Sequence, residues 1–118
     1  MPARVLIVDD HPRFRQTARR TLEADGWEVV GEAGDGAGAL RAVDALDADV
    51  VLLDVGLPDV SGLDVARDLR AQNPELAVVV VSTHDSDDYR ELALASGARG
   101  FLAKSGLSGA ALEEILQG

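Results

Sequence analysis

The sequence contains no cysteine among its 118 residues. This absence excludes a disulfide framework, a thiolate nucleophile and a zinc site built from cysteine. Basic residues are also scarce, because 11 Lys and Arg stand against 21 Asp and Glu, for a formal net charge of −10. Affinity for nucleic acid comes largely from cationic contacts to phosphate, so we expect that this domain itself binds no nucleic acid.

Long hydrophobic runs are missing at the start of the chain, where the first apolar run ends at Asp9. That run is much too short for the core of a signal peptide or for a membrane span. We therefore predict a cytoplasmic protein that makes no contact with a membrane. The length is that of one ordinary domain, so we expect residues 1–118 to form a single domain that needs no metal or disulfide to hold its core.

What the sequence does contain is a regular alternation of apolar runs, which predict strands, with stretches of helical period. The predicted strands are RVLIVDD (4–10), WEVVGEA (27–33), 49–54, about 76–82 and about 98–102. Five helices are predicted between and after these strands. The first starts at Pro12 and ends at Gly26, the second covers 37–46, and the third opens with a capping box at Ser61 and stops at Asn73-Pro74. The fourth runs from about 86 to 96 and is closed by Gly97, and the last contains Leu112, Ile115 and Leu116. This alternation predicts an α/β fold with a doubly wound parallel sheet of five strands.

Polar side chains stand at or just beyond the carboxyl ends of four predicted strands. They are Asp9 and Asp10, Asp54, Ser82 and Lys104. In open α/β sheets, ligands bind outside the carboxyl ends of the strands, where the strand order reverses. We therefore expect these five side chains to converge on one site.

Three carboxylates at one edge repel one another, and each resists ionisation unless a cation compensates its charge. Ligation by oxygen alone suits a hard ion, and Mg²⁺ typically uses few carboxylates and binds alongside phosphate. The acids therefore predict Mg²⁺ beside a phosphoryl group, with Lys104 as a second positive charge and the Ser82 hydroxyl as a hydrogen-bond donor. If Asp9 and Asp10 hold the metal, Asp54 is left to act as a nucleophile and form an aspartyl phosphate.

Five stretches of the sequence, each weak alone, are together highly specific for one family. They are VDDHPRFR at 8–15, AGDGAGAL at 33–40, DVVLLDVGLPDVSGLDV at 49–65, VVVVST at 78–83 and GARGFLAKS at 97–105. Over essentially its full length the chain resembles the receiver domain of bacterial response regulators, most closely receivers of NarL/FixJ-like regulators, which precede a LuxR-type DNA-binding domain. The resemblance implies a flavodoxin-like (CheY-like) sandwich of five βα units with strand order 2-1-3-4-5.

The resemblance also assigns roles in a metal site. It makes Asp54 the phosphoacceptor and Asp9 and Asp10 the acids that hold Mg²⁺. Asp54 itself and the backbone carbonyl of Gly56 would be further ligands to the same ion.

A second group of residues matches the family's switch. Ser82 resembles the hydroxyl residue that moves toward the phosphoryl oxygens, and Thr83 the small residue beside it. Lys104 matches the family's lysine, and Phe101 the aromatic residue whose rotamer reports activation.

These roles imply a signalling switch rather than an enzyme. A sensor histidine kinase, or a small acyl phosphate, would donate the phosphoryl group, and the surface of the fourth helix, fifth strand and last helix would then control homodimerisation or an output domain. The sequence ends at Gly118 without a helix-turn-helix. We expect the natural protein to continue into a LuxR-type DNA-binding domain that regulates transcription, and the alternative is a stand-alone receiver.

Several positions depart from the family pattern. Leu57 replaces a frequent methionine, Ser105 stands where a proline often follows the lysine, and Phe101 replaces a frequent tyrosine, so a switch there rests on packing alone. Gly56 and His84 occupy positions that in relatives influence how readily water attacks the acyl phosphate. Gly56 leaves that approach open, which favours a short-lived phosphoryl group.

A dinucleotide-binding module is the first rival interpretation. Residues 34–39 fit G-x-G-x-x-A after a predicted strand, and Asp54 follows at about 20 residues, where such folds carry the acid that binds ribose. Against this, Asp35 sits in the turn that the pyrophosphate would approach, and the fingerprint leaves Asp9, Asp10 and Lys104 without roles.

Two further rivals keep part of the chemistry. A haloacid-dehalogenase-like phosphatase uses an acid two residues after the nucleophile, whereas this chain has Gly56 there. A degenerate receiver would bind partners without phosphorylation, which the complete residue set argues against. His11 could be imagined as a phosphoryl carrier, but His-Pro at a helix start favours a loop residue.

Overall fold

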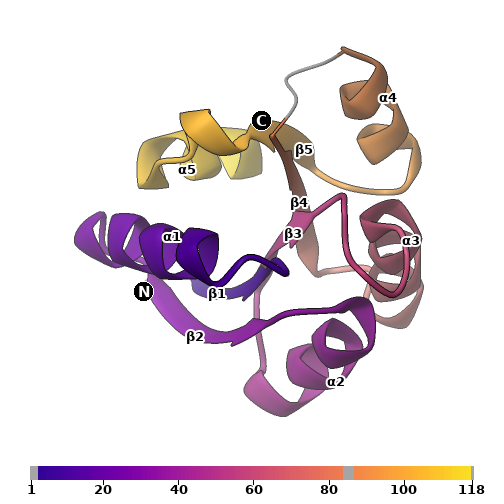
Figure 1. The fold of residues 1–118 in the computed structure, drawn as a ribbon, viewed down its shortest axis with the longest axis horizontal. Coiled ribbons are helices and arrows are strands. Elements are labelled where there is room, and N and C mark those ends of the chain that lie inside the picture. The colour runs from indigo at the N-terminus through magenta and orange to yellow at the C-terminus, as the bar shows by residue number, and fades with distance from the viewer. Residues whose placement is uncertain (1–2, 84–86, 118) are drawn as a thin grey trace.

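A computed structural model describes residues 3–83 and 87–117, and in these residues strands and helices alternate as predicted (Figure 1). The strands are β1 (Arg4–Val8), β2 (Glu28–Ala33), β3 (Val50–Asp54), β4 (Ala77–Ser82) and β5 (Gly100–Ala103). The helices are α1 (Pro12–Ala24), α2 (Gly36–Leu46), α3 (Gly62–Gln72), α4 (Asp87–Ala95) and α5 (Gly109–Gln117), with a 3₁₀ turn, η1 (Lys104–Gly106), between β5 and α5. No helix in the described residues is long and apolar enough to cross a bilayer.

The described strands form one parallel sheet in the order β2-β1-β3-β4-β5. Helices α1 and α5 cover one face of this sheet, and α2, α3 and α4 cover the other (Figure 1). The order reverses between β1 and β3, so the crevice at their carboxyl ends is the place where such a fold positions ligands. The predicted fold class and strand order are confirmed.

The sheet is buried on both faces at its centre. Every residue of β3 and β4 is buried, as expected for strands covered by helices on either side. Side chains alternate between the faces, so Leu52 packs with α1 and α5 while Leu53 packs with α2, α3 and α4. This aliphatic interior leaves the strand ends as the natural place for polar groups.

Glycines end two of the helices, as predicted. Gly26 and Gly97 follow α1 and α4 with φ of +92° and +94°, a left-handed conformation that glycine adopts without a steric penalty. The fifth strand, predicted over about 98–102, lies at Gly100–Ala103, so its start is two residues later than expected. The N–H of Ala98 donates to the carbonyl of Ala93 at 3.1 Å and so still closes α4, and β5 begins only at Gly100.

The predicted capping box at the start of α3 is half formed. Ser61 Oγ accepts a hydrogen bond from the N–H of Leu63 at 3.2 Å, which is the expected N-cap interaction. Asp64, the expected partner residue, instead pairs with Arg67 one turn further along the helix, at 3.0 Å.

Candidate functional site

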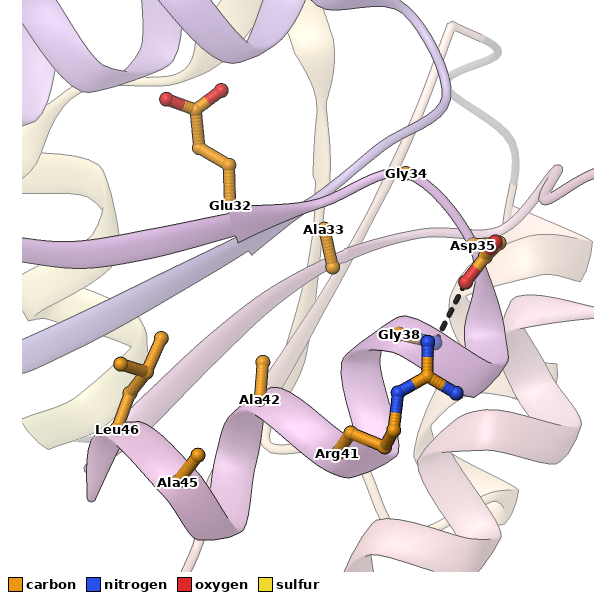
Figure 2. A pocket seen from close by; sticks show the side chains of 9 residues that line it. All are labelled: Glu32, Ala33, Gly34, Asp35, Gly38, Arg41, Ala42, Ala45 and Leu46. Atoms are coloured by element: carbon orange, nitrogen blue, oxygen red, sulfur yellow. Dashed lines mark hydrogen bonds between the residues drawn. The ribbon is translucent and has the colours of Figure 1, made fainter.

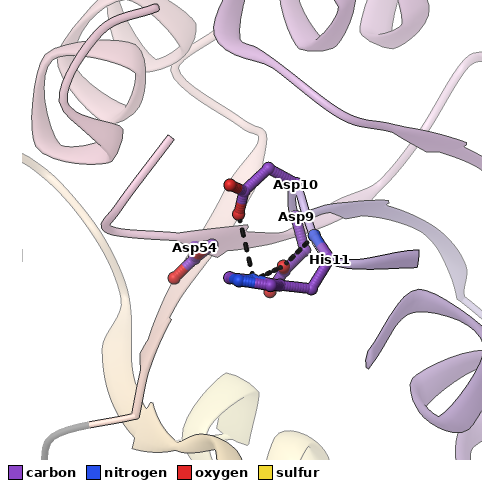
Figure 3. A group of neighbouring side chains, drawn as sticks. All are labelled: Asp9, Asp10, His11 and Asp54. Carbon is purple, nitrogen blue, oxygen red and sulfur yellow. Dashed lines mark hydrogen bonds and ion pairs between the residues drawn. The ribbon is translucent and has the colours of Figure 1, made fainter. Parts of the chain in front are cut away.

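Three carboxylates and one imidazole meet at the carboxyl end of β1 and β3, which are neighbouring strands (Figure 3). Asp9, Asp10 and His11 directly follow β1, and Asp54 is the last residue of β3. Each of the four side chains offers one ligand atom, and these atoms all lie within 4.8 Å of one another. The predicted convergence of the three acids is therefore confirmed, and His11 joins them.

The acids are buried to different degrees and are poorly supplied with hydrogen-bond donors. Asp9 is fully buried, Asp54 is 5% exposed, and the Asp10 side chain is 31% exposed. Oδ2 of Asp9 and Oδ1 of Asp10 are buried without a hydrogen bond from any described residue. Since a buried carboxylate oxygen without a donor is costly, these oxygens fit the requirements of a cation ligand.

Lys104 supplies the positive charge of this site. It opens η1 directly after β5, and its side chain is 12% exposed. Its Nζ lies 2.6 Å from Asp9 Oδ2 and 3.6 Å from Asp54 Oδ2, so Asp9 is the closer partner. The Asp9 contact compensates charge without the geometry of a hydrogen bond. The Phe14 ring lies 4.5 Å from the same Nζ and forms a cation–π contact.

The environment of Asp54 resists its ionisation. Burial is the largest cause of a raised pKa of Asp54, and the nearby charge of Asp9 adds to it, with a smaller contribution from Asp10. The charge of Lys104 and a hydrogen bond from the N–H of Gly56 oppose this rise without cancelling it. A further cation beside Asp54 would relieve the remaining repulsion.

The predicted switch residues lie on β4, directly after it, and on β5. Ser82 is buried at the end of β4 and Thr83 follows it, exposed. Phe101 is 1% exposed, with the Arg90 guanidinium 5.6 Å from the centre of its ring. The ring therefore already points inward in this structure, and the inward rotation on activation stays a prediction. His84 lies outside the described residues.

The segment between β3 and α3 passes tightly around Asp54. Gly56 and Ser61 form an antiparallel bridge, and the N–H of Gly62 donates to the carbonyl of Val55 at 2.9 Å. A Cβ on Gly62 would lie 2.1 Å from the carbonyl oxygen of Asp54, so only glycine fits there. At Gly56, by contrast, a Cβ would meet none of the described residues within 4 Å, which agrees with an open approach to Asp54.

A second group of acids lies at the N-terminus of α2. Asp35 Oδ1 accepts from the N–H of Gly38 at 2.6 Å. Asp59 reaches over from the β3–α3 segment and accepts from the N–H groups of Gly36 at 2.9 Å and Ala37 at 3.1 Å. These hydrogen bonds, that from Gly36 first, lower the pKa of Asp59.

This second group weighs against the dinucleotide interpretation. The backbone N–H groups that a pyrophosphate would need at the start of α2 are taken by carboxylates of the chain itself. The adjoining hollow between β2 and α2 has a volume of about 500 Å³, is open to solvent, and is lined by Asp35 and Arg41, whereas the Glu32 side chain points away from α2 (Figure 2) and pairs with Arg15 and Arg19.

Sequence reasoning missed three contributors to this edge of the sheet. His11 was interpreted as a loop residue, yet its ring lies against two of the acids. Phe14 covers Lys104, and the guanidinium of Arg15 donates to the carbonyl of Asp9 at 2.6 Å. The sequence signal was available for each, because all three follow Asp10 within the stretch HPRFR and one turn of α1 brings them back to the strand end.

The protein is an α/β protein whose parallel sheet has the strand order 2-1-3-4-5 and carries clustered acids and a lysine at its carboxyl edge. The family model described as "Response regulator receiver domain" matches residues 5–117. The chain belongs to this family of two-component signalling proteins.

Individual relatives agree with this membership. The chain is 40% identical over 118 residues to the nitrate/nitrite response regulator NarP of Escherichia coli, covering 99% of this chain and 55% of NarP. The signal receiver domain of NarL from Mycobacterium tuberculosis is similar in structure, with a TM-score of 0.90, 38% identity and 99% and 98% of the two chains covered. The receiver domain of RcsB from Salmonella enterica, solved with the phosphomimetic BeF₃⁻, gives a TM-score of 0.88 at 26% identity, covering 100% and 91%.

The chain spans about half the length of the curated relatives that it matches, which include the transcriptional regulatory protein DegU of Brevibacillus brevis at 48% coverage. Receivers of this family are signalling switches, and relatives of this one regulate transcription.

Proposed function

We propose that this receiver is switched by phosphorylation of Asp54, with a phosphohistidine of a sensor kinase, or a small acyl phosphate, as the donor. The observation that supports this most strongly is the meeting of Asp9, Asp10 and Asp54 within one ion's reach, beside Lys104 and with two buried oxygens unsatisfied. Such an arrangement contributes little to stability, and it suits a site that receives a cation and an anion together.

Mg²⁺ fits this donor set. Carboxylate oxygens of Asp9, Asp10 and Asp54 would hold it, together with the backbone carbonyl of Gly56, the ligand that the family resemblance implies. When bound, it neutralises charge on the transferring phosphoryl group, which is the main task of catalysis in phosphoryl transfer.

The residues of the chain have separate tasks in the transfer. A carboxylate oxygen of Asp54 attacks phosphorus, the P–N bond of the phosphohistidine breaks, and the imidazole nitrogen leaves with the bonding electrons. Lys104, now closer to Asp9 than to Asp54, moves onto the new phosphoryl oxygens, and the Ser82 hydroxyl donates a hydrogen bond to them. Asp9 gives up its lysine at the same time, and a cation held by Asp9 and Asp10 would replace that charge.

The readout is a change in the surface formed by α4, β5 and α5. Movement of Lys104 and Ser82 pulls on the ends of β5 and β4, and the packing around Phe101 then shifts between two populated arrangements. We propose residues 1–118 as a single receiver domain that, in the whole protein, controls homodimerisation or an output domain, which we infer to be a C-terminal LuxR-type DNA-binding domain. The length and transcriptional roles of the relatives support this.

Phosphoryl transfer can be tested with acetyl phosphate and Mg²⁺ on the purified chain. We expect intact-mass spectrometry to show one added phosphoryl group, lost in Asp54→Asn and retained in Asp64→Asn, a control that alters an exposed acid on α3. Peptide mapping after borohydride reduction should place the group on Asp54. Undiminished labelling of Asp54→Asn would reject the assignment.

A further inference from the structure

His11 lies in the acidic site but has no task in the proposed transfer. Its ring is largely exposed, at 65%, yet Nδ1 lies 3.1 Å from Asp9 Oδ1 and 3.1 Å from Asp10 Oδ1 (Figure 3). The backbone N–H of His11 also donates to Asp9 Oδ1, at 2.8 Å, so the ring is held to this edge at its base. One nitrogen therefore faces two carboxylates, and one oxygen of each, Asp9 Oδ2 and Asp10 Oδ1, is buried without a hydrogen bond from any described residue.

The spacing of these atoms is that of ligands around one metal ion. First-row ions bind carboxylate oxygen and imidazole nitrogen at about 2.1 Å, so neighbouring ligands at right angles lie about 3.0 Å apart and opposite ligands about 4.2 Å apart. The observed separations of Nδ1 from both carboxylates are 3.1 Å, and the whole set of Asp9, Asp10, His11 and Asp54 lies within 4.8 Å. Little movement is needed for all four to reach one ion.

We propose that His11 makes this acidic cluster a mixed nitrogen and oxygen site, in which Nδ1 coordinates divalent transition ions such as Ni²⁺ and Co²⁺ in competition with Mg²⁺. The inference rests on the proposed metal position, but it adds a ligand and a class of ion. Imidazole suits Ni²⁺, Co²⁺ and Zn²⁺, whereas Mg²⁺ takes oxygen ligands and keeps its waters. His11 therefore strengthens binding of the first class and leaves Mg²⁺ binding almost unchanged.

Coordination also defines where the ring proton must be. A metal on Nδ1 leaves the proton on Nε2, and the hydrogen bond between Nδ1 and Asp9 Oδ1 in the metal-free protein is lost. If the ring only hydrogen-bonds the acids, its removal changes the affinity for every cation in the same way. The two cases are thus separated by the ratio of affinities.

Calorimetric titration of the purified chain with Ni²⁺ and with Mg²⁺ tests this ratio. In His11→Asn we expect the Ni²⁺ affinity to fall by at least about tenfold, since even outer-shell partners of a metal are worth that much, while the Mg²⁺ affinity changes by less than about twofold. His84→Asn, which removes the other histidine of the chain, and Arg13→Gln, an exposed neighbour, are the controls and should bind both ions normally.

Paramagnetic proton NMR with Co²⁺ gives a direct signature. We expect one exchangeable, strongly shifted ring N–H resonance that is present in the parent chain and in His84→Asn and absent in His11→Asn. Persistence of this resonance in His11→Asn, or an equal loss of Ni²⁺ and Mg²⁺ affinity, would overturn the inference. If Mg²⁺ binds and Asp54 is labelled, but His11→Asn leaves the Ni²⁺ affinity unchanged, only this inference fails. If neither ion binds the parent chain, the proposed function fails as well.

Discussion

Two groups of acids lie at the same edge of the sheet and differ in how well the chain supplies them with hydrogen-bond donors. Asp35 and Asp59 each accept backbone N–H groups at the start of α2, and these hydrogen bonds lower the pKa of Asp59. Asp9 and Asp10 each have a buried oxygen with no described donor, and their charges, together with burial, raise the pKa of Asp54.

The comparison shows how to separate structural from functional carboxylates in this fold. The acids at α2 are satisfied by the chain itself and hold the β3–α3 segment against a helix end. The acids at β1 and β3 depend on Lys104 for compensation, and they repel one another. A protein tolerates such repulsion where the site must accept a further charge.

The largest expected effect comes from removing the lysine. Lys104→Met leaves fully buried Asp9 without a countercharge, so without divalent cations we expect a loss of about 3–5 kcal/mol in the free energy of unfolding. Mg²⁺ should stabilise this variant more than the parent chain. Urea unfolding with and without Mg²⁺ measures both, and Arg67→Met, which breaks an exposed pair, should cost only about 0–1 kcal/mol. A cost for Lys104→Met no larger than this control would show that Asp9 does not need the lysine.

A smaller, opposite effect is expected at the phosphoacceptor. Asp54→Asn removes a repelled charge and should raise the stability by about 0.5–2 kcal/mol at pH 7 without divalent cations. Because the pKa of Asp54 is raised in the fold, the folded chain holds this proton more tightly than the unfolded chain, where the ordinary value is 3.8. The stability that this proton provides is lost as the pH rises through the raised pKa. The gain from Asp54→Asn should therefore be full above the raised pKa and vanish as the pH falls below 3.8. A gain that does not depend on pH would contradict the electrostatic cause.

The cation–π contact allows a finer test of how Lys104 is positioned. Phe14→Leu keeps an apolar side chain on α1 but removes the ring face that lies 4.5 Å from Nζ. We expect a loss of about 0.5–1 kcal/mol in stability and a change in the NMR shifts of the Lys104 ε-methylene as the ring current disappears. Unchanged Lys104 shifts would mean that the ring does not contact the ammonium group in solution.

The smallest effect is expected at the satisfied acids. Asp59→Asn weakens the hydrogen bonds to the N–H groups of Gly36 and Ala37, so their hydrogen exchange should accelerate. Since the pKa of Asp59 is lowered by folding, its contribution is present above the ordinary value of 3.8 and is lost as the pH falls through the lowered pKa. In strong acid, the N–H groups of Gly36 and Ala37 should therefore exchange at similar rates in the parent chain and in Asp59→Asn. Equal rates at neutral pH would show that Asp59 is dispensable as a cap.

Much of the fold follows from local signals in the sequence. Apolar runs locate the strands because a sheet covered on both faces needs uninterrupted burial, and Gly26 and Gly97 mark helix ends because they adopt positive φ. The same reasoning places Asp9, Asp54 and Lys104 at one edge, since parallel strands all end there. Element boundaries shifted by a residue or two, as at β5, where the N–H of Ala98 still donates to a carbonyl at the end of α4.

Contacts between distant segments could not be predicted in the same way. Asp59 caps α2 from 22 and 23 residues away, and the path of the β3–α3 segment decides this, not any local pattern. Phe14 has the spacing of a core residue on α1. Only the position of the Lys104 ammonium group in the folded chain shows that the Phe14 ring makes a cation–π contact. The contact of the His11 ring with Asp9 depends on the side-chain rotamer, which the sequence does not indicate.

The central claim is that Asp9, Asp10 and Asp54 share one divalent cation. Diffraction from crystals soaked in Mn²⁺, recorded at the manganese absorption edge, tests this most directly. A single anomalous peak within coordination distance of all three carboxylates is predicted, and it should vanish in crystals of Asp10→Asn. A peak elsewhere, or no peak at saturating Mn²⁺ in crystals that leave this edge open, would contradict the claim.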